Sequence, residues 1–136
     1  MPAQITRAAA LIAVGVLVAC TPVRSDVPTV PPNTDFDIAV GAVARLRDSD
    51  LTVRFDTVTE DSRCPTDVTC VWEGNATALV TLDSAGKTAQ VQFTTSKPQS
   101  VRAYGWTFEL RAVRPPRTSQ SPPGPSEYVI TLRASP

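Results

Sequence analysis

Apolar residues alternate with polar ones along most of the chain after residue 35. A period of two over five to eight residues is typical of β-strands that bury one face. Gly, Pro, Asp and Ser separate the runs, and none has helical spacing. The alternating sets are Phe36, Ile38 and Val40; Leu51, Val53 and Phe55; Ala76, Ala78, Val80 and Leu82; Val91 and Phe93; Tyr104, Trp106, Phe108 and Leu110; and Tyr128, Ile130 and Leu132. They predict an all-β domain of about six to seven antiparallel strands, folded as a small β-sandwich or barrel.

The segments between these runs have the composition of turns. Residues 83–87 predict a hairpin loop with Gly86 at positive φ, and residues 48–50 predict a similar connection. Residues 114–125 contain five prolines, which a central strand does not accommodate, so we expect an exposed loop there. The core is expected around Phe55, Trp106, Phe108 and Tyr128.

Residues 1–19 resemble a bacterial lipoprotein signal peptide. Arg7 precedes the apolar run 8–18, and residues 17–20 read L-V-A-C, which resembles a lipobox. Eleven helical residues span only about 17 Å of a hydrocarbon core that is about 30 Å thick, too short for a stable membrane span. The resemblance implies cleavage before Cys20 and diacylglycerol on its sulfur, usually with an amide-linked acyl chain such as palmitate. The alternative is an ordinary secretory signal that leaves Cys20 as a free thiol.

The lipobox implies a chain anchored through lipid on Cys20 to the extracytoplasmic side of a membrane in the bacterial cell envelope. Residues 20–34 contain four prolines and few apolar residues, so they predict a lipid anchor followed by an extended linker. At about 3.1 Å per residue the linker reaches up to about 40 Å. Residues 35–136 then form one β-domain.

Cys64 and Cys70 remain once Cys20 is assigned to the anchor. An even pair in an oxidising compartment predicts a disulfide, and its spacing differs from that of C-x-x-C redox motifs. Closing a loop of about seven residues stabilises a fold by roughly 2 to 2.5 kcal/mol on the chain-entropy estimate. We therefore expect a structural bridge.

The stretch around this pair carries a distinctive motif. Residues 60–65 read E-D-S-R-C-P and residues 70–74 read C-V-W-E-G, followed by an alternating run. The motif resembles one found in a family of small uncharacterised bacterial exported proteins and lipoproteins. The resemblance implies the disulfide and the β-fold, and it implies no activity. Alanine is common in that family where this chain has Glu73, so Glu73 is expected to face solvent.

The disulfide-closed segment is expected to be a rigid loop. Asp61 and Ser62 favour an Asx-type turn, and Trp72 is expected to cover the disulfide or to insert into the core. One hypothesis is purely structural. Another is a recognition surface that displays Arg63, Asp67 and Glu73, because a pre-organised loop loses little entropy on binding. A special case is a protease inhibitor that presents Arg63.

Composition argues against several other functions. Loss of Arg7 with the signal leaves 12 basic and 13 acidic residues, and the two signs alternate along the chain. No cluster of basic residues is therefore expected to bind nucleic acid. The chain has no histidine, the usual general base, so no enzyme activity and no catalytic residue are predicted. A carboxylate hydrolase that pairs Glu60 with Asp61 or Glu73 is a further alternative.

We predict neither a metal nor a cofactor. The carboxylates at Glu60, Asp61, Asp67 and Glu73 match no calcium loop, and calcium needs six to eight oxygens. The sequence therefore favours a non-enzymatic binding or interaction module with an envelope protein or glycan as partner. A passive structural component of the envelope is the alternative. A binding module predicts an exposed apolar or aromatic patch near residues 60–75 or 114–125, whereas an enzyme predicts a pocket with converging carboxylates.

Overall fold

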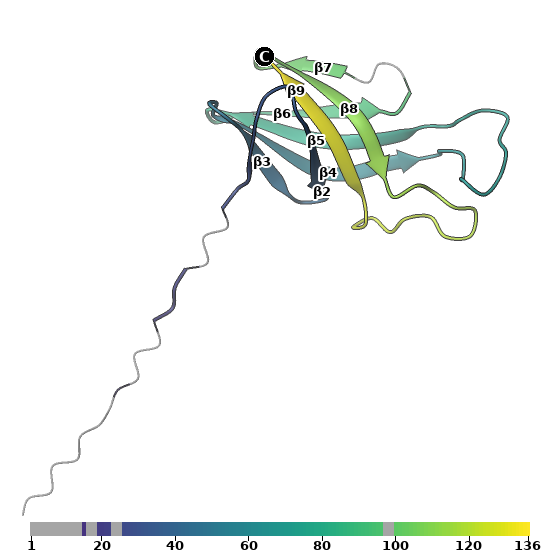
Figure 1. Cartoon of the computed structure of the whole chain (residues 1–136), viewed down its shortest axis with the longest axis horizontal. Coiled ribbons are helices and arrows are strands. Elements are labelled where there is room, and N and C mark those ends of the chain that lie inside the picture. The colour runs from purple at the N-terminus through teal and green to yellow at the C-terminus, as the bar shows by residue number, and fades with distance from the viewer. Residues whose placement is uncertain (1–14, 16–18, 23–25, 97–99) are drawn as a thin grey trace, which may run out of the picture.

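The protein folds as a β-sandwich of two sheets packed face to face, shown by a computed structural model (Figure 1). The structure describes residues 15, 19–22, 26–96 and 100–136. Nine strands lie within these residues: β1 (Thr29–Val30), β2 (Asp35–Ala39), β3 (Val43–Leu46), β4 (Leu51–Asp61), β5 (Ala76–Ser84), β6 (Lys87–Thr94), β7 (Ser100–Ala103), β8 (Trp106–Arg114) and β9 (Val129–Ser135). The all-β prediction is confirmed, and of its two forms the sandwich is the one found.

One sheet has five strands in the order β1-β3-β4-β5-β6, and the other has four in the order β2-β9-β8-β7. Every pair is antiparallel except β1 with β3, which is parallel. The predicted hairpin at residues 83–87 has a two-residue loop, Ala85 and Gly86, both at positive φ. This is the left-handed geometry of the tight turns that match strand twist.

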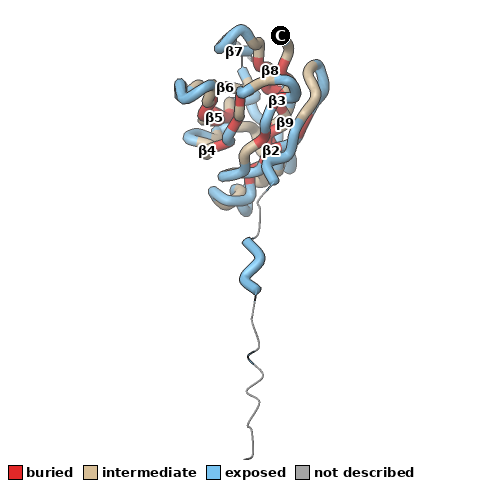
Figure 2. Tube along the Cα trace, turned by 90° about the vertical axis from the view of Figure 1, so that its left-hand side faces the viewer, coloured by how far each residue is buried: buried red, intermediate tan, exposed pale blue. Residues whose placement is uncertain are grey.

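The core lies between the two sheets, where the buried faces of the strands meet (Figure 2). Phe55 and Phe108 have no exposed surface, and Tyr128 is buried, as predicted. Trp106 is only partly buried and packs against the edge of the core. Tyr104 does not belong to the strand predicted there, because it occupies a two-residue turn with Gly105 between β7 and β8, at φ 51°.

The strand number exceeds the prediction because β1, β3 and β7 are too short to show an alternating pattern. β1 comes from the predicted linker: Thr29 and Val30 pair with Arg45 and Leu46, and Arg45 N donates to Pro28 O at 2.9 Å. Among the described residues, backbone pairing with the sheet therefore includes residues 28–30, within the segment predicted as the linker.

Most of the predicted signal peptide, residues 1–14 and 16–18, lies outside the described residues. Cys20 is described and has an exposed thiol with no disulfide partner in that part of the chain. Among the described residues, no helix has both the length and the hydropathy that a membrane crossing requires.

Two β-bulges in β4 determine which of its residues face the core. They lie between Phe55 and Thr57 and between Val58 and Glu60. Directly paired residues on neighbouring strands point to the same face of a sheet. Phe55, Val58 and Asp61 pair with three buried residues of β5, namely Val80, Ala78 and Ala76. The bulges thus turn every third residue inward here, and they place Asp61 on the inner face at the open end of the sandwich.

Candidate functional site

Two loops project side by side from one end of the sandwich (Figure 1). The disulfide loop, residues 62–75, joins β4 to β5. The proline-rich loop, residues 115–128, joins β8 to β9. Both coincide with segments predicted as loops, but their contact with each other was not predicted.

The disulfide loop is closed at two levels. The Cys64–Cys70 disulfide is present, with a Cα–Cα distance of 5.9 Å, which confirms the predicted bridge. Below it, Ser62 N donates to Asn75 O at 2.7 Å and Cys64 N donates to Glu73 O at 2.8 Å. The ladder between β4 and β5 therefore continues into the loop, and the bridge fixes the remainder.

Gly74 permits this close neck. It has φ +69°, and a Cβ atom there would lie 1.8 Å from the carbonyl oxygen of Ser62. No other residue type fits without movement of the backbone, because glycine alone lacks a Cβ. The glycine of the C-V-W-E-G motif is thus required by the loop geometry.

A partly buried ion pair fixes the base of the loop. Arg63 donates from Nε to Asp61 Oδ1 and from Nη2 to Asp61 Oδ2, both at 2.8 Å. Only 15% of the Arg63 side chain and 9% of the Asp61 side chain are exposed. The Tyr128 hydroxyl donates to Asp61 Oδ2 at 2.9 Å, so the proline-rich loop shares the same carboxylate. A bidentate arginine–carboxylate pair of this kind specifies geometry as well as charge.

Further hydrogen bonds join the two loops. Arg63 donates to the carbonyl oxygens of Val113 and Pro115 at 2.8 and 2.9 Å. Arg117 Nη1 donates to Asp61 O at 3.0 Å, and Thr66 N donates to Arg117 O at 2.9 Å.

Farther out on the loops, Asp67 accepts hydrogen bonds from both the backbone N–H and the hydroxyl of Ser119. The Asp67 pKa lies below its usual value, first because of the Ser119 hydroxyl and then because of the Ser119 N–H. The two loops therefore form one hydrogen-bonded unit from base to tip.

The protonation states match this network. Burial by itself would raise the pKa of Asp61, but hydrogen bonds from Arg63 and Tyr128 and the charge of Arg63 outweigh it, so the pKa lies below its usual value. Burial, and then the hydrogen bond to Asp61, raise the pKa of Tyr128. At neutral pH the carboxylate is ionised and the phenol is a donor. An Asx-type contact, Arg63 N to Asp61 Oδ1 at 3.3 Å, agrees with the predicted turn.

The outer part of the disulfide loop exposes three apolar side chains. Val68 is 47%, Val71 102% and Trp72 82% exposed. The expectation that Trp72 covers the disulfide or enters the core is wrong. The loop is fixed by the bridge and by Arg63 instead, which leaves Trp72 in solvent. We call Val68, Val71 and Trp72 the apolar tip.

Of the three residues predicted to form a binding surface, Arg63 and Glu73 lie together at the neck of the loop, where both line one hollow, and Asp67 lies farther out. Glu73 is exposed, as expected. Asp67 is exposed but engaged with Ser119. Arg63 turns inward to Asp61 and to two carbonyl groups, so the expectation that it is displayed to a partner or a protease is wrong. Arg63 turns inward because the carboxylate of Asp61 lies on the inner face of the sheet and would otherwise have no charged partner there.

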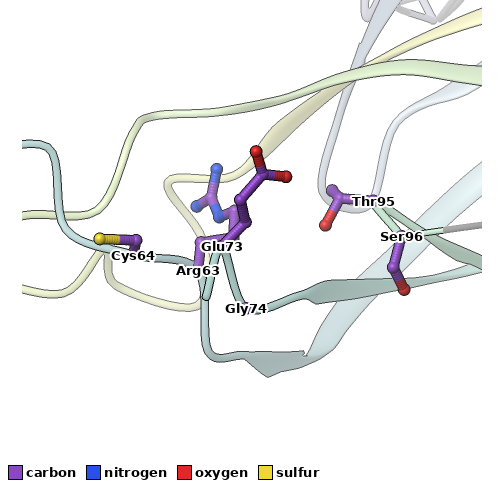
Figure 3. Close-up of a pocket in the computed structure, with 6 residues that line it drawn as sticks. All are labelled: Arg63, Cys64, Glu73, Gly74, Thr95 and Ser96. Carbon is purple, nitrogen blue, oxygen red and sulfur yellow. The ribbon is translucent and has the colours of Figure 1, made fainter. Parts of the chain in front are cut away.

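A hollow of about 360 Å³ lies beside the neck of the disulfide loop (Figure 3). Its lining comprises Arg63, Cys64, Glu73, Gly74, Thr95 and Ser96. Asn75 ties the two walls together, because its Oδ1 accepts from Ser96 N at 3.0 Å and from the Thr95 hydroxyl at 3.2 Å. Within the described ranges, no group of three or more histidine, cysteine, aspartate or glutamate residues is arranged to hold a metal ion.

No family model, no curated protein and no solved structure matches the chain. The apolar tip is therefore identified from geometry alone. One signal in the sequence points to it: Val71 and Trp72 are adjacent, and neighbouring residues of an extended chain cannot both face one core.

Proposed function

We propose that this protein is a lipid-anchored, non-enzymatic binding module of the bacterial cell envelope that engages its partner through the apolar tip. The observation that carries the proposal is Trp72, which is 82% exposed on a loop closed by a disulfide and fixed by a partly buried ion pair. Tryptophan is the residue type most often found at energetic hot spots of interfaces, where its loss costs about 2 kcal/mol or more.

The rigidity of the loop supports binding in preference to passive exposure. Ordering a flexible loop costs free energy on association, about 0.5 to 1.5 kcal/mol for each side chain immobilised. Here the disulfide, the backbone ladder of the neck and the contacts of Arg63 have already ordered the backbone beneath the tip. Most of the free energy gained by burying Trp72 is then available to the complex.

The charges around the tip indicate the chemistry of the partner. Glu60, Asp67 and Glu73 are exposed on and beside the disulfide loop, whereas the positive charge of Arg63 is paired with the carboxylate of Asp61. The exposed charges of the disulfide loop itself are therefore negative, and Arg117 of the proline-rich loop is partly buried with a hydrogen bond to Asp61 O. Negative charge on the loop disfavours anionic lipid headgroups and anionic glycans as partners. We propose an envelope protein with an apolar pocket for Trp72 and a basic rim.

The alternatives have less support. An inhibitor needs an accessible Arg63, which is internal. A carboxylate hydrolase based on Asp61 needs a free carboxyl group, but Arg63 and Tyr128 occupy both of its oxygens. A passive envelope component gives no reason for the exposed Trp72.

Site-specific photo-cross-linking in the host envelope tests the proposal. The full chain carries a photoreactive phenylalanine analogue in place of Trp72 or, as a matched control, in place of Tyr104, an exposed aromatic residue of the β7–β8 turn. We expect an adduct with one other protein from position 72 and no adduct with another protein from position 104. The absence of an adduct at 72 contradicts the proposal, and an adduct containing only glycan contradicts the assignment of a protein partner.

The anchor is tested separately by intact-mass measurement of protein recovered from the host. The proposal expects diacylglycerol on Cys20, and a Cys20→Ser chain released from the membrane fraction. An unmodified Cys20 contradicts this part alone.

A further inference from the structure

β6 is a long strand at the open edge of the five-stranded sheet. It has eight residues, Lys87–Thr94, and within the described part of the chain only β5 pairs with it. Its composition is K-T-A-Q-V-Q-F-T, with one charge at the first position, no proline and no bulge in its pairing with β5. Proteins usually protect such edges, because a free edge strand is a template for another strand.

The other three sheet edges do have protecting features. β1 has only two residues. β2 carries Asp35 and Asp37, which pair with Arg133 and Arg114. β7 has four residues and carries Arg102. β6 is therefore the edge that the fold leaves available.

The hairpin register shows which backbone groups of β6 are free. A two-residue loop joins Ser84 to Lys87, so this pair exchanges hydrogen bonds, and every second residue after Lys87 does the same with β5. The N–H and C=O groups of Thr88, Gln90, Gln92 and Thr94 consequently face away from the sheet. The side chains of Thr88, Gln90 and Gln92 are exposed and uncharged.

We propose that β6 pairs antiparallel with β6 of a second copy of this chain, which joins two five-stranded sheets into one. The register that pairs all four free residues places Gln90 opposite Gln92 and Thr88 opposite Thr94 of the second copy. Val91 then lies on the two-fold axis. Lys87 lies beyond the paired residues, so no like charges face each other, and the edge is complementary to itself.

An apolar seam supports a second copy as the occupant. Val91 of β6, Val101 and Ala103 of β7 and Trp106 of β8 all pack against the core but remain partly exposed. These four residues lie on the side of the sandwich where β6 is the edge of the five-stranded sheet and β7 is the edge of the four-stranded sheet. In the proposed pair the seams of both copies meet across the axis, so each covers the other. This surface does not include the disulfide loop and is independent of the proposed function.

Cysteine cross-linking of the full chain in its envelope tests the pairing. Val91→Cys places two thiols on the axis, at a Cα separation of about 4.5 Å, within the range for a disulfide. Thr88→Cys is the control, because two copies of residue 88 lie about 20 Å apart in this register. We expect a reducible species of doubled mass with Val91→Cys and not with Thr88→Cys. Adding Gln90→Pro, which removes an N–H that faces away from β5, should abolish it.

Several results would overturn the pairing. These are a monomeric Val91→Cys chain that melts like the unmodified protein, equal cross-linking of both variants, and a disulfide to a different polypeptide. A photoreactive residue at Gln92 provides a second measurement that needs no new thiol. It should yield the same doubled mass, and its failure to do so counts against the pair.

Discussion

Replacing Asp61 by asparagine should unfold the base of the two loops. The substitution keeps the shape but removes the charge that faces Arg63, and its amide hydrogens meet donors at Arg63 and Tyr128. Removing one partner of a fully buried ion pair costs about 3 to 5 kcal/mol. Because 15% of the Arg63 side chain is still exposed, we expect about 2 to 4 kcal/mol here.

This loss is measurable by urea unfolding and by melting temperature. For a domain of this size, about 1 kcal/mol corresponds to roughly 4 °C, so the melting temperature should fall by about 8 to 16 °C. Asp35→Asn is the matched control. Asp35 pairs with Arg133 on the surface, where both side chains are about 40% exposed, and its loss should cost less than about 1 kcal/mol.

A double-mutant cycle with Arg63→Met isolates the pair. The double variant should lose less than the sum of the two single variants, with a coupling of about 1 to 3 kcal/mol. The cost of Asp61→Asn should also depend on pH. The pKa of Asp61 is lowered in the folded chain, so its stabilisation is complete above an ordinary carboxyl pKa of about 4 and is lost as the pH falls through the lower folded value. A cost below about 0.5 kcal/mol at pH 7, or additive single effects, refutes the reasoning.

Three further outcomes are expected. Trp72→Ser should abolish capture of the partner that cross-links at position 72 and change the unfolding free energy by less than about 0.5 kcal/mol, because the side chain is exposed; a large loss of stability would place it in the core. The Cys64→Ser/Cys70→Ser chain should lose about 2 kcal/mol and show faster amide exchange in residues 62–75, and unchanged exchange would mean that the bridge is redundant. Gly74→Ala should lower the unfolding free energy more than Gly86→Ala. Both glycines have positive φ, which costs alanine about 1 to 2 kcal/mol, but only position 74 adds a clash, with Ser62 O. Equal losses by urea unfolding would exclude the clash.

The long strands could be predicted because a two-residue period records which side chains face the core. The same rule failed where the period is broken. Strict alternation after Phe55 would turn Thr57 and Thr59 inward, but two bulges bring Val58 inward instead. Bulges leave no reliable mark in the sequence. Short strands such as β1 were missed because two residues carry no period.

The candidate site was only half predictable. The disulfide was expected from the cysteine number and from the predicted compartment, and it is present. The direction of the Arg63 side chain depends on Asp61 and on carbonyl groups about fifty residues away, at Val113 and Pro115. Such long-range partners cannot be found from local spacing. Arg63 was predicted to be displayed and Trp72 to be packed against the disulfide or the core. In the structure Arg63 is bound to Asp61 and Trp72 is exposed.

The fluorescence of Trp72 tests the central claim most directly. In a Trp106→Phe chain, Trp72 is the sole tryptophan. The free protein should emit at the long wavelength of a solvated indole and be quenched readily by acrylamide. Its anisotropy should be high, because the loop is fixed. Addition of the purified cross-linked partner should shift the emission to shorter wavelength and protect it from quenching. A short-wavelength, protected emission in the free protein, or a spectrum that the partner does not change, would contradict the claim that Trp72 is a pre-organised contact residue.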